Sequence, residues 1–107
     1  MSSRRLTMVA EEIAHLAADF FARESNAQSL ITVTHADVSP DLKNVRIYIS
    51  VLPENLEDSA LAFAKRNRTE FREYLKEHSA LRFLPTIDFA IDYGEKNRQR
   101  IDDLTRF

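Results

Sequence analysis

The residues best suited to chemistry in this sequence are basic side chains gathered in one stretch, residues 65–82. This stretch holds six basic residues against three acidic ones, whereas the rest of the chain holds nine against fourteen. Because Lys and Arg neutralise phosphates, a positive stretch in an otherwise acidic chain is a candidate face for binding nucleic acid. The six residues are Lys65, Arg66, Arg68, Arg72, Lys76 and Arg82. The alternative is a solvated helix whose surface charges pair at ordinary i,i+4 spacing.

Groups suited to catalysis or metal binding are sparse. The three histidines show no ligand spacing such as an i,i+4 pair, and there is no cysteine, so we predict no metal site. These histidines are His15, His35 and His78. The single glycine, Gly94, cannot build a glycine-rich phosphate loop or a nucleophile elbow. We therefore predict that the chain is not an enzyme and uses no cofactor.

Four further side chains have both a structural and a chemical interpretation. Asp88 and Asp92 alternate with apolar residues of a predicted strand, so we expect them to face solvent rather than to form an acid–base pair. Tyr48 and Phe83 could stack on bases, although aromatic residues in strands more often pack against their neighbours.

Length and composition predict one domain that spans residues 1–107. The chain is 44% hydrophobic with a net charge of −2, which is typical of a globular protein that folds without disulfides or metals. The lack of cysteine fits a reducing compartment, and no apolar run has the length of a secretory core or a membrane span. We therefore expect a cytoplasmic protein that makes no membrane contact and is a monomer when free.

Hydrophobic periodicity predicts the elements that position these residues. Apolar residues recur at helical spacing over about residues 5–24, which predicts an amphipathic helix. Residues 30–38 are rich in β-branched side chains and predict a strand with Ile31, Val33 and His35 on one side.

A hairpin should follow. Ser39-Pro40-Asp41 is typical of a turn, and the alternation of apolar and polar residues over 45–51 predicts a second strand. Two strands joined by so short a turn should pair antiparallel, with one apolar face that needs helices to cover it.

The second half of the chain predicts two helices and a third strand. Asn55 could cap a helix, Phe71 begins the apolar stripe of another, and residues 87–91 alternate as a strand. Between the helices lies Asn67-Arg68-Thr69, where a left-handed Asn could end one helix and Thr could cap the next at a kink, although an unbroken helix is also open. Residues 94–107 should form a short helix or a flexible tail.

The order is therefore α, β, β, α, α, β. By the rules of layer packing this is an α+β fold with one three-stranded sheet and helices on one face, the arrangement of a type II KH-like domain.

Three stretches together resemble the ribosome-binding factor A family. Residues 39–52, Ser-Pro-Asp-Leu-Lys-Asn-Val-Arg-Ile-Tyr-Ile-Ser-Val-Leu, are similar to the family's Ser-x-Asp-Leu turn and the apolar strand with a central Tyr that follows. Residues 72–89, and above all Leu-Arg-Phe-Leu-Pro-Thr-Ile-Asp-Phe at 81–89, resemble its Leu-Arg-x-x-Pro-x-Leu-x-Phe entry to the last strand. Arg4 and Arg5 resemble its N-terminal start. The resemblance extends over about residues 4–104.

The resemblance implies a KH-like, non-enzymatic factor that binds the immature small (30S) ribosomal subunit and supports maturation of 16S rRNA. The subunit and its 16S rRNA would then be the partners. Lys43 and Arg46, which stand in the first of these motifs, complete the set of candidate rRNA-binding residues.

This sequence departs from the family in two places. Glu24-Ser25-Asn26-Ala27 stands where the family has Asp-Pro-Arg before the first strand, and the kink differs as well. Asn67-Arg68-Thr69 replaces the usual Ala-x-Gly, and one glycine cannot form the Gly-x-x-Gly clamp of a standard KH domain. Arg68 could instead meet phosphates through its side chain, which positions a protein on RNA without reading its sequence. Two alternatives remain open, namely a protein–protein interaction module without RNA binding and a generic RNA chaperone.

Overall fold

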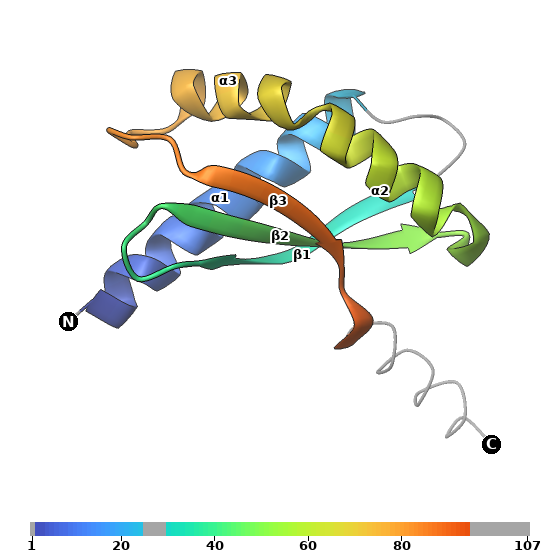
Figure 1. Ribbon diagram of the computed structural model, residues 1–107, viewed down its shortest axis with the longest axis horizontal. Coiled ribbons are helices and arrows are strands. Elements are labelled where there is room, and N and C mark those ends of the chain that lie inside the picture. The colour runs from blue at the N-terminus through green and yellow to red at the C-terminus, as the bar shows by residue number, and fades with distance from the viewer. Residues whose placement is uncertain (1, 25–29, 95–107) are drawn as a thin grey trace.

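The computed structural model describes residues 2–24 and 30–94 (Figure 1). Its elements follow the predicted order α, β, β, α, α, β, with one short 3-10 turn, η1, added before the second helix. They are α1 (Ser2–Glu24), β1 (Leu30–Val38), β2 (Asn44–Leu52), η1 (Glu54–Leu56), α2 (Glu57–Arg66), α3 (Arg68–His78) and β3 (Thr86–Ile91). The predicted α+β class is confirmed. The prediction of a terminal helix or tail lies outside the described residues from residue 95 onward.

The three strands form one sheet in the order β1-β2-β3, so β2 lies at its centre (Figure 1). β1 and β2 pair antiparallel, as expected for strands joined by a short turn, whereas β2 and β3 pair parallel. A parallel pair needs a long crossover connection, which here is made by α2 and α3. The whole basic stretch, residues 65–82, lies within this crossover.

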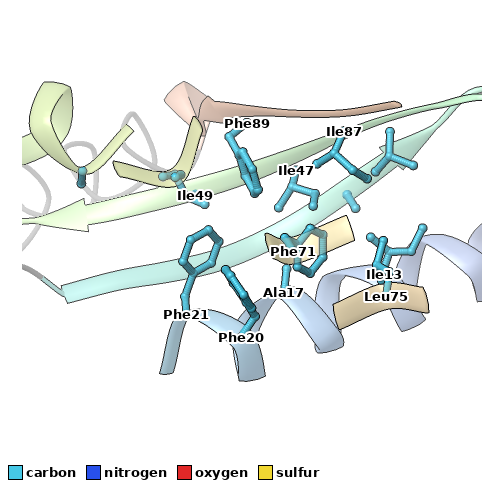
Figure 2. Close-up of a cluster of buried hydrophobic side chains, with 14 of the residues drawn as sticks. Ile13, Ala17, Phe20, Phe21, Ile47, Ile49, Phe71, Leu75, Ile87 and Phe89 are labelled. Carbon is cyan, nitrogen blue, oxygen red and sulfur yellow. The ribbon is translucent and has the colours of Figure 1, made fainter. Parts of the chain in front are cut away.

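The hydrophobic core lies between one face of the sheet and the three helices (Figure 2). The rings of Phe20 and Phe21 in α1 meet those of Phe71 in α3 and Phe89 in β3, with centroids 5.4 Å and 5.5 Å apart. The helices contribute Ile13, Ala17, Phe20, Phe21, Ala60, Ala64, Phe71 and Leu75, and the strands contribute Ala36, Val45, Ile47, Ile49, Val51, Ile87, Phe89 and Ile91. Because the helices use this face alone, the opposite face of the sheet carries the polar strand residues.

A β-bulge in β1 changes which of its residues face the core. The register shifts between Val33 and His35, so that His35 lies opposite Tyr48 and Ala36 lies opposite Ile47. A bulge adds one residue to a strand and thereby reverses the alternation beyond it. The prediction that His35 shares a side with Ile31 and Val33 is therefore wrong. Its ring instead stacks on Tyr48, with centroids 4.5 Å apart.

The start of α2 also differs from the prediction. Asn55 lies within η1, and Leu56 stands at the N-cap position of α2 without a side-chain capping bond. The N–H of Leu56 bonds to the carbonyl of Pro53 at 3.0 Å, which closes a 3-10 turn ahead of the helix. Glu57 and Asp58 then supply negative charge to the first turn of α2 and favour its dipole. The prediction that Asn55 caps this helix was wrong because the turn after Pro53 takes its place.

Candidate nucleic-acid interface

The junction between α2 and α3 is built around one residue, Asn67. Its side-chain amide donates to the carbonyl of Phe63 at 2.8 Å, and its carbonyl accepts the N–H of Phe71 at 2.9 Å. Asn67 has φ −94° and ψ 13°, so it is not left-handed, and Thr69 lies inside α3 rather than at its cap. Both of those expectations were wrong, because the amide of Asn67 satisfies a terminal carbonyl of α2 without a left-handed residue. The junction places Arg68 at the first position of α3.

Arg68 reaches from the start of α3 to the edge of the sheet. Its Nη2 lies 3.5 Å from Oδ1 of Asp88 in β3, and the two side chains are 43% and 46% exposed. The same Asp88 oxygen accepts the backbone N–H of Phe89 at 2.9 Å. Nε of Arg68 is buried and has no hydrogen-bond partner within the described part of the chain. The guanidinium group is therefore held near the sheet with donor capacity to spare.

Arg46 lies near Arg68 on the open face of the sheet. The strand register places Arg46 of β2 opposite Asp37 of β1 and opposite Asp88 of β3. Both arginines line one shallow hollow of about 700 Å³, together with Tyr48 and both aspartates. We call this the sheet hollow. Its two positive and two negative side chains balance, so it is not by itself a strongly positive site.

The charges of α3 are separated onto different sides of the helix. Arg68, Arg72 and Lys76 recur at i, i+4 and i+8 and therefore share a side, on which Arg72 and Lys76 are exposed. The acidic residues of α3 line a different hollow, next to Phe20 and Arg23 of α1. These acidic residues are Glu70, Glu73 and Glu77. Lys65 and Arg66 are exposed in the last turn of α2, where positive charge favours the helix dipole.

Lys43 and Arg82 lie at the end of the molecule that holds the β1–β2 turn. Together with Arg5 and Phe83 they line a second hollow, of about 640 Å³, which we call the hairpin hollow. Thr86 lines both hollows, and its N–H donates to the carbonyl of Lys43 at 2.8 Å. The eight candidate residues thus do not form one cluster. They divide between the sheet hollow, the α2 end, the exposed side of α3 and the hairpin hollow.

The predicted turn at Ser39-Pro40-Asp41 is confirmed and is held by its own side chains. The hydroxyl of Ser39 donates to Oδ1 of Asp41 at 2.6 Å, and the same oxygen accepts the N–H of Lys43 at 3.0 Å. These hydrogen bonds, chiefly the one from Ser39, hold the pKa of the Asp41 carboxyl below its usual value. Leu42, which lies between Asp41 and Lys43, has a positive φ of 61°, a backbone conformation that residues other than Gly rarely adopt.

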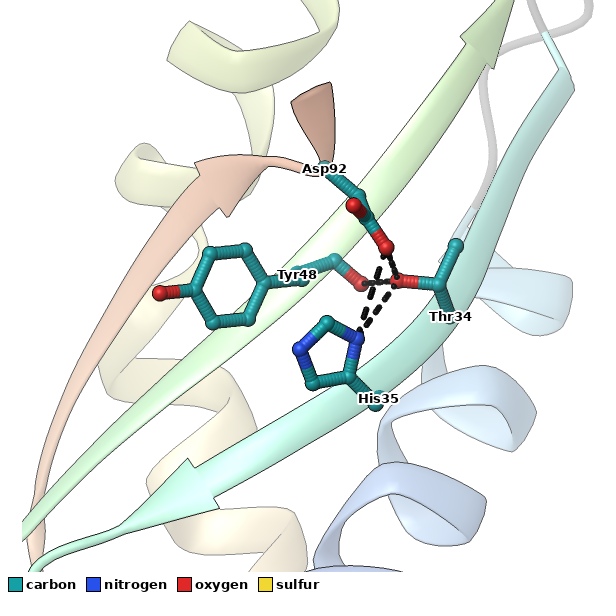
Figure 3. Close-up of polar contacts among 4 residues, drawn as sticks. All are labelled: Thr34, His35, Tyr48 and Asp92. Atoms are coloured by element: carbon teal, nitrogen blue, oxygen red, sulfur yellow. Dashed lines mark hydrogen bonds and ion pairs between the residues drawn. The ribbon is translucent and has the colours of Figure 1, made fainter. Parts of the chain in front are cut away.

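A polar cluster at the bulge was missed by the sequence interpretation (Figure 3). The hydroxyl of Thr34 donates to Oδ2 of Asp92 at 2.6 Å, and Nδ1 of His35 lies 3.4 Å from the same oxygen. Asp92 is only 7% exposed, so the expectation that it faces solvent was wrong. Its N–H also donates to the carbonyl of Ile49 at 2.8 Å. The position of Asp92 directly after a predicted strand was the one sequence signal for this cluster. Its partners Thr34 and His35 could not be predicted, because they face Asp92 only as a result of the bulge.

Within residues 2–24 and 30–94, no three His, Asp or Glu side chains gather in a way that could hold a metal ion. No helix in that part of the chain combines the length and the apolar character needed to cross a bilayer.

Comparison with known proteins relates this chain to one family. The family model for ribosome-binding factor A matches residues 5–105. A ribosome-binding factor A of Bradyrhizobium sp. strain ORS 278 is 34% identical over 97% of this chain and 79% of its own length. Another, from Anaeromyxobacter sp. strain Fw109-5, is 34% identical over 95% of this chain and 87% of its own length.

Solved structures share the fold. The crystal structure of ribosome-binding factor A from Thermus thermophilus aligns with a TM-score of 0.73 at 20% identity, over 80% of this chain and 94% of that one. A homology model of Thermus thermophilus ribosome-binding factor A, fitted into the cryo-EM map of a 30S complex with that factor, aligns with a TM-score of 0.72 at 19% identity, over 82% of this chain and 96% of that one.

Proposed function

The chain belongs to the ribosome-binding factor A family, and we propose that it binds the immature small ribosomal subunit and supports maturation of 16S rRNA. It does so as a binding factor, without catalysing a reaction. The fitting of a Thermus thermophilus relative into a 30S complex supports the subunit as partner. The structural observation that carries the proposal is the separation of charge on α3, which turns Arg68, Arg72 and Lys76 to one side.

Contact with RNA is made by side chains rather than by a backbone clamp. Phosphate contacts from Arg and Lys position a protein on a helix but carry no sequence information. A factor that uses them recognises the shape and spacing of RNA backbones, and its affinity falls as salt rises because bound counterions are released.

Arg68 is the central residue of this contact. Its ion pair with Asp88 is half exposed and long at 3.5 Å, and exposed pairs of this kind contribute only about 0.2–1 kcal/mol. Exchanging Asp88 for a phosphate therefore costs little, because a phosphate can accept the same guanidinium N–H that Asp88 accepts. Arg72 and Lys76 then continue the contact along α3.

The proposal is tested by co-sedimentation with purified small subunits over a series of salt concentrations. Replacing Arg66, Arg68 and Arg72 together by Gln should weaken binding and lower the slope of log affinity against log salt by about two to three units. The change Arg23→Gln removes one positive charge of α1 that lies beside the acidic residues of α3, and it should leave the slope unchanged. Because Arg68 is half buried, the double variant R72Q/K76Q provides a test at two exposed positions.

Unchanged binding and slope in both multiple variants would overturn this assignment of the face. An affinity for the subunit that does not change with salt concentration would favour a contact with a ribosomal protein. Equal affinity for unstructured RNA and for subunits would favour a general RNA chaperone.

A further inference from the structure

The hairpin hollow combines positive charge with an exposed aromatic ring. Three cations line it from three separate segments, namely Arg5 in α1, Lys43 in the β1–β2 turn and Arg82 in the α3–β3 connection. Its volume of about 640 Å³ lies in the usual range of sites that hold small organic groups. The convergence of distant segments makes this a formed hollow and not a run of surface charge.

The one carboxylate that lines the hollow is engaged by the turn. Oδ1 of Asp41 accepts both the Ser39 hydroxyl and the Lys43 N–H, so this oxygen is engaged within the turn. Three cations therefore stand against one acid, and the lining carries a net positive charge. An anionic group is the occupant that this charge favours.

Phe83 adds an exposed aromatic ring to the positive charge of the hollow. The ring is 81% exposed, more than any other large hydrophobic side chain among the described residues. It follows Arg82 directly in a connection that has neither helix nor strand, so no sheet packing accounts for it. An exposed ring beside cations is the combination with which proteins hold unstacked bases, the ring taking the base and the cations the phosphate.

The left-handed backbone of Leu42 is a further indication that the turn forms part of a binding site. Its left-handed backbone is held by its own N–H bond to the Ser39 carbonyl, at 2.9 Å, and by the bonds that Asp41 makes. Unfavourable backbone conformations persist only where the surroundings hold them, and they gather at binding sites. Leu42 itself lines the hollow and directly precedes Lys43, so this conformation lies at the proposed site.

We propose that the hairpin hollow binds one unpaired nucleotide, with its base stacked on Phe83 and its phosphate bound by Arg5, Lys43 and Arg82. This inference rests on the proposed function and deepens it. The side of α3 that carries Arg68, Arg72 and Lys76 contacts the backbone of any RNA, whereas the hollow requires a base that is not stacked on neighbouring bases. Stacking is tolerant of sequence, so the site selects unpaired RNA without selecting a particular base.

The probe is an unstructured RNA octamer that contains a single 2-aminopurine, whose fluorescence falls when the base stacks on a ring. The full chain should quench this signal on binding. Phe83→Leu keeps an apolar side chain but removes the ring, and it should lower affinity about 5- to 150-fold, the range for one stacked base, and abolish the quenching. Phe83→Trp should retain both. Met8→Ala, at an exposed apolar side chain outside the hollow, should behave as the unaltered chain.

The charges are tested separately. Lys43→Gln and Arg82→Gln should each reduce the salt slope for the octamer by about one unit. A fully paired RNA duplex of equal length should bind the unaltered chain and F83L with equal affinity, since it offers no free base.

The outcomes separate this inference from the proposed function. If the chain sediments with small subunits but F83L binds and quenches the octamer as the unaltered chain does, the nucleotide site is wrong and the proposed function stands. If F83L loses subunit affinity but the octamer shows no Phe83-dependent quenching, the hollow contacts a ribosomal protein, which also overturns the inference. If the chain fails to bind subunits, the proposed function is wrong; quenching of the octamer that depends on Phe83 would still support the nucleotide site, and its absence would overturn that site as well.

Discussion

The hydroxyl of Thr34 donates a 2.6 Å hydrogen bond to the carboxylate of Asp92, which ties the bulge of β1 to the end of β3 across the central strand. The two residues stand 58 positions apart in the sequence. The same hydroxyl lies 3.2 Å from the carbonyl oxygen of Tyr48 in β2, so all three strands meet at this point (Figure 3). The contact therefore holds the register of the whole sheet and not of one pair of strands.

Removing the Thr34 hydroxyl should destabilise the protein. Thr34→Val keeps the shape of the side chain but deprives a nearly buried carboxylate of a donor, and we expect a loss of about 1–3 kcal/mol in the free energy of unfolding. Urea denaturation measures this loss as a lower midpoint. The matched control is Thr32→Val, at an exposed position of the same strand. Equal midpoints for the two variants would show that the contact does not stabilise the fold.

The turn at Ser39 should be recognisable by the titration of Asp41. The Ser39 hydroxyl, and next the Lys43 N–H, lower the pKa of this carboxyl below its ordinary 3.8. A pKa that is lower in the folded state stabilises the protein above the unfolded pKa, and this contribution is lost as the pH falls toward the folded value. NMR titration of the carboxyl should show a higher pKa in Ser39→Ala. Ser59→Ala, which removes a hydroxyl from α2, should leave it where it was. A pKa that does not move in S39A would contradict the assignment of its cause.

Phe71 should be one of the most sensitive positions of the core. Its side chain is fully buried and its ring meets those of Phe20 and Phe89. Phe71→Ala should cost about 3–5 kcal/mol, a large share of the stability of a small domain. Phe83→Ala, the same change at an exposed ring, should alter stability by no more than about 0.5 kcal/mol. Thermal and urea unfolding of the two variants measure the contrast, and a large loss in F83A would show that this ring is structural.

Asn67 offers a test of how α2 ends. Since its φ is −94° and its amide bonds to Phe63, Asn67→Ala should cost about 0.5–1.5 kcal/mol. Asn67→Gly should cost more than Ala, because glycine has the larger conformational entropy to lose and gains nothing at a negative φ. Chemical denaturation ranks the three chains. A glycine variant more stable than the parent would mean that this residue is left-handed in solution.

The regular elements could be predicted from the sequence wherever the period was unbroken. The alternation from Val45 to Val51 defined β2, since every second residue of the central strand must be buried. The reversal beyond Val33 could not be predicted in this way. A bulge leaves the composition of a strand unchanged and alters only the side to which later residues point, which is why His35 and Asp92 were misplaced.

The candidate site shows a similar division. The separation of charge on α3 follows from helical spacing alone and was accessible to sequence reasoning. The meeting of Lys43 with Arg82 and of Arg68 with Asp88 depends on β3 pairing parallel to β2. This pairing could not be predicted from any local sequence pattern, because it joins residues on either side of a long crossover.

The parallel pairing of β2 and β3 also fixes the distance between the sheet hollow and the hairpin hollow. Thr86 opens the shared ladder and lines both hollows, so neither hollow can shift without the other. An RNA that filled both would have to present its backbone and its free base at a separation set by the sheet.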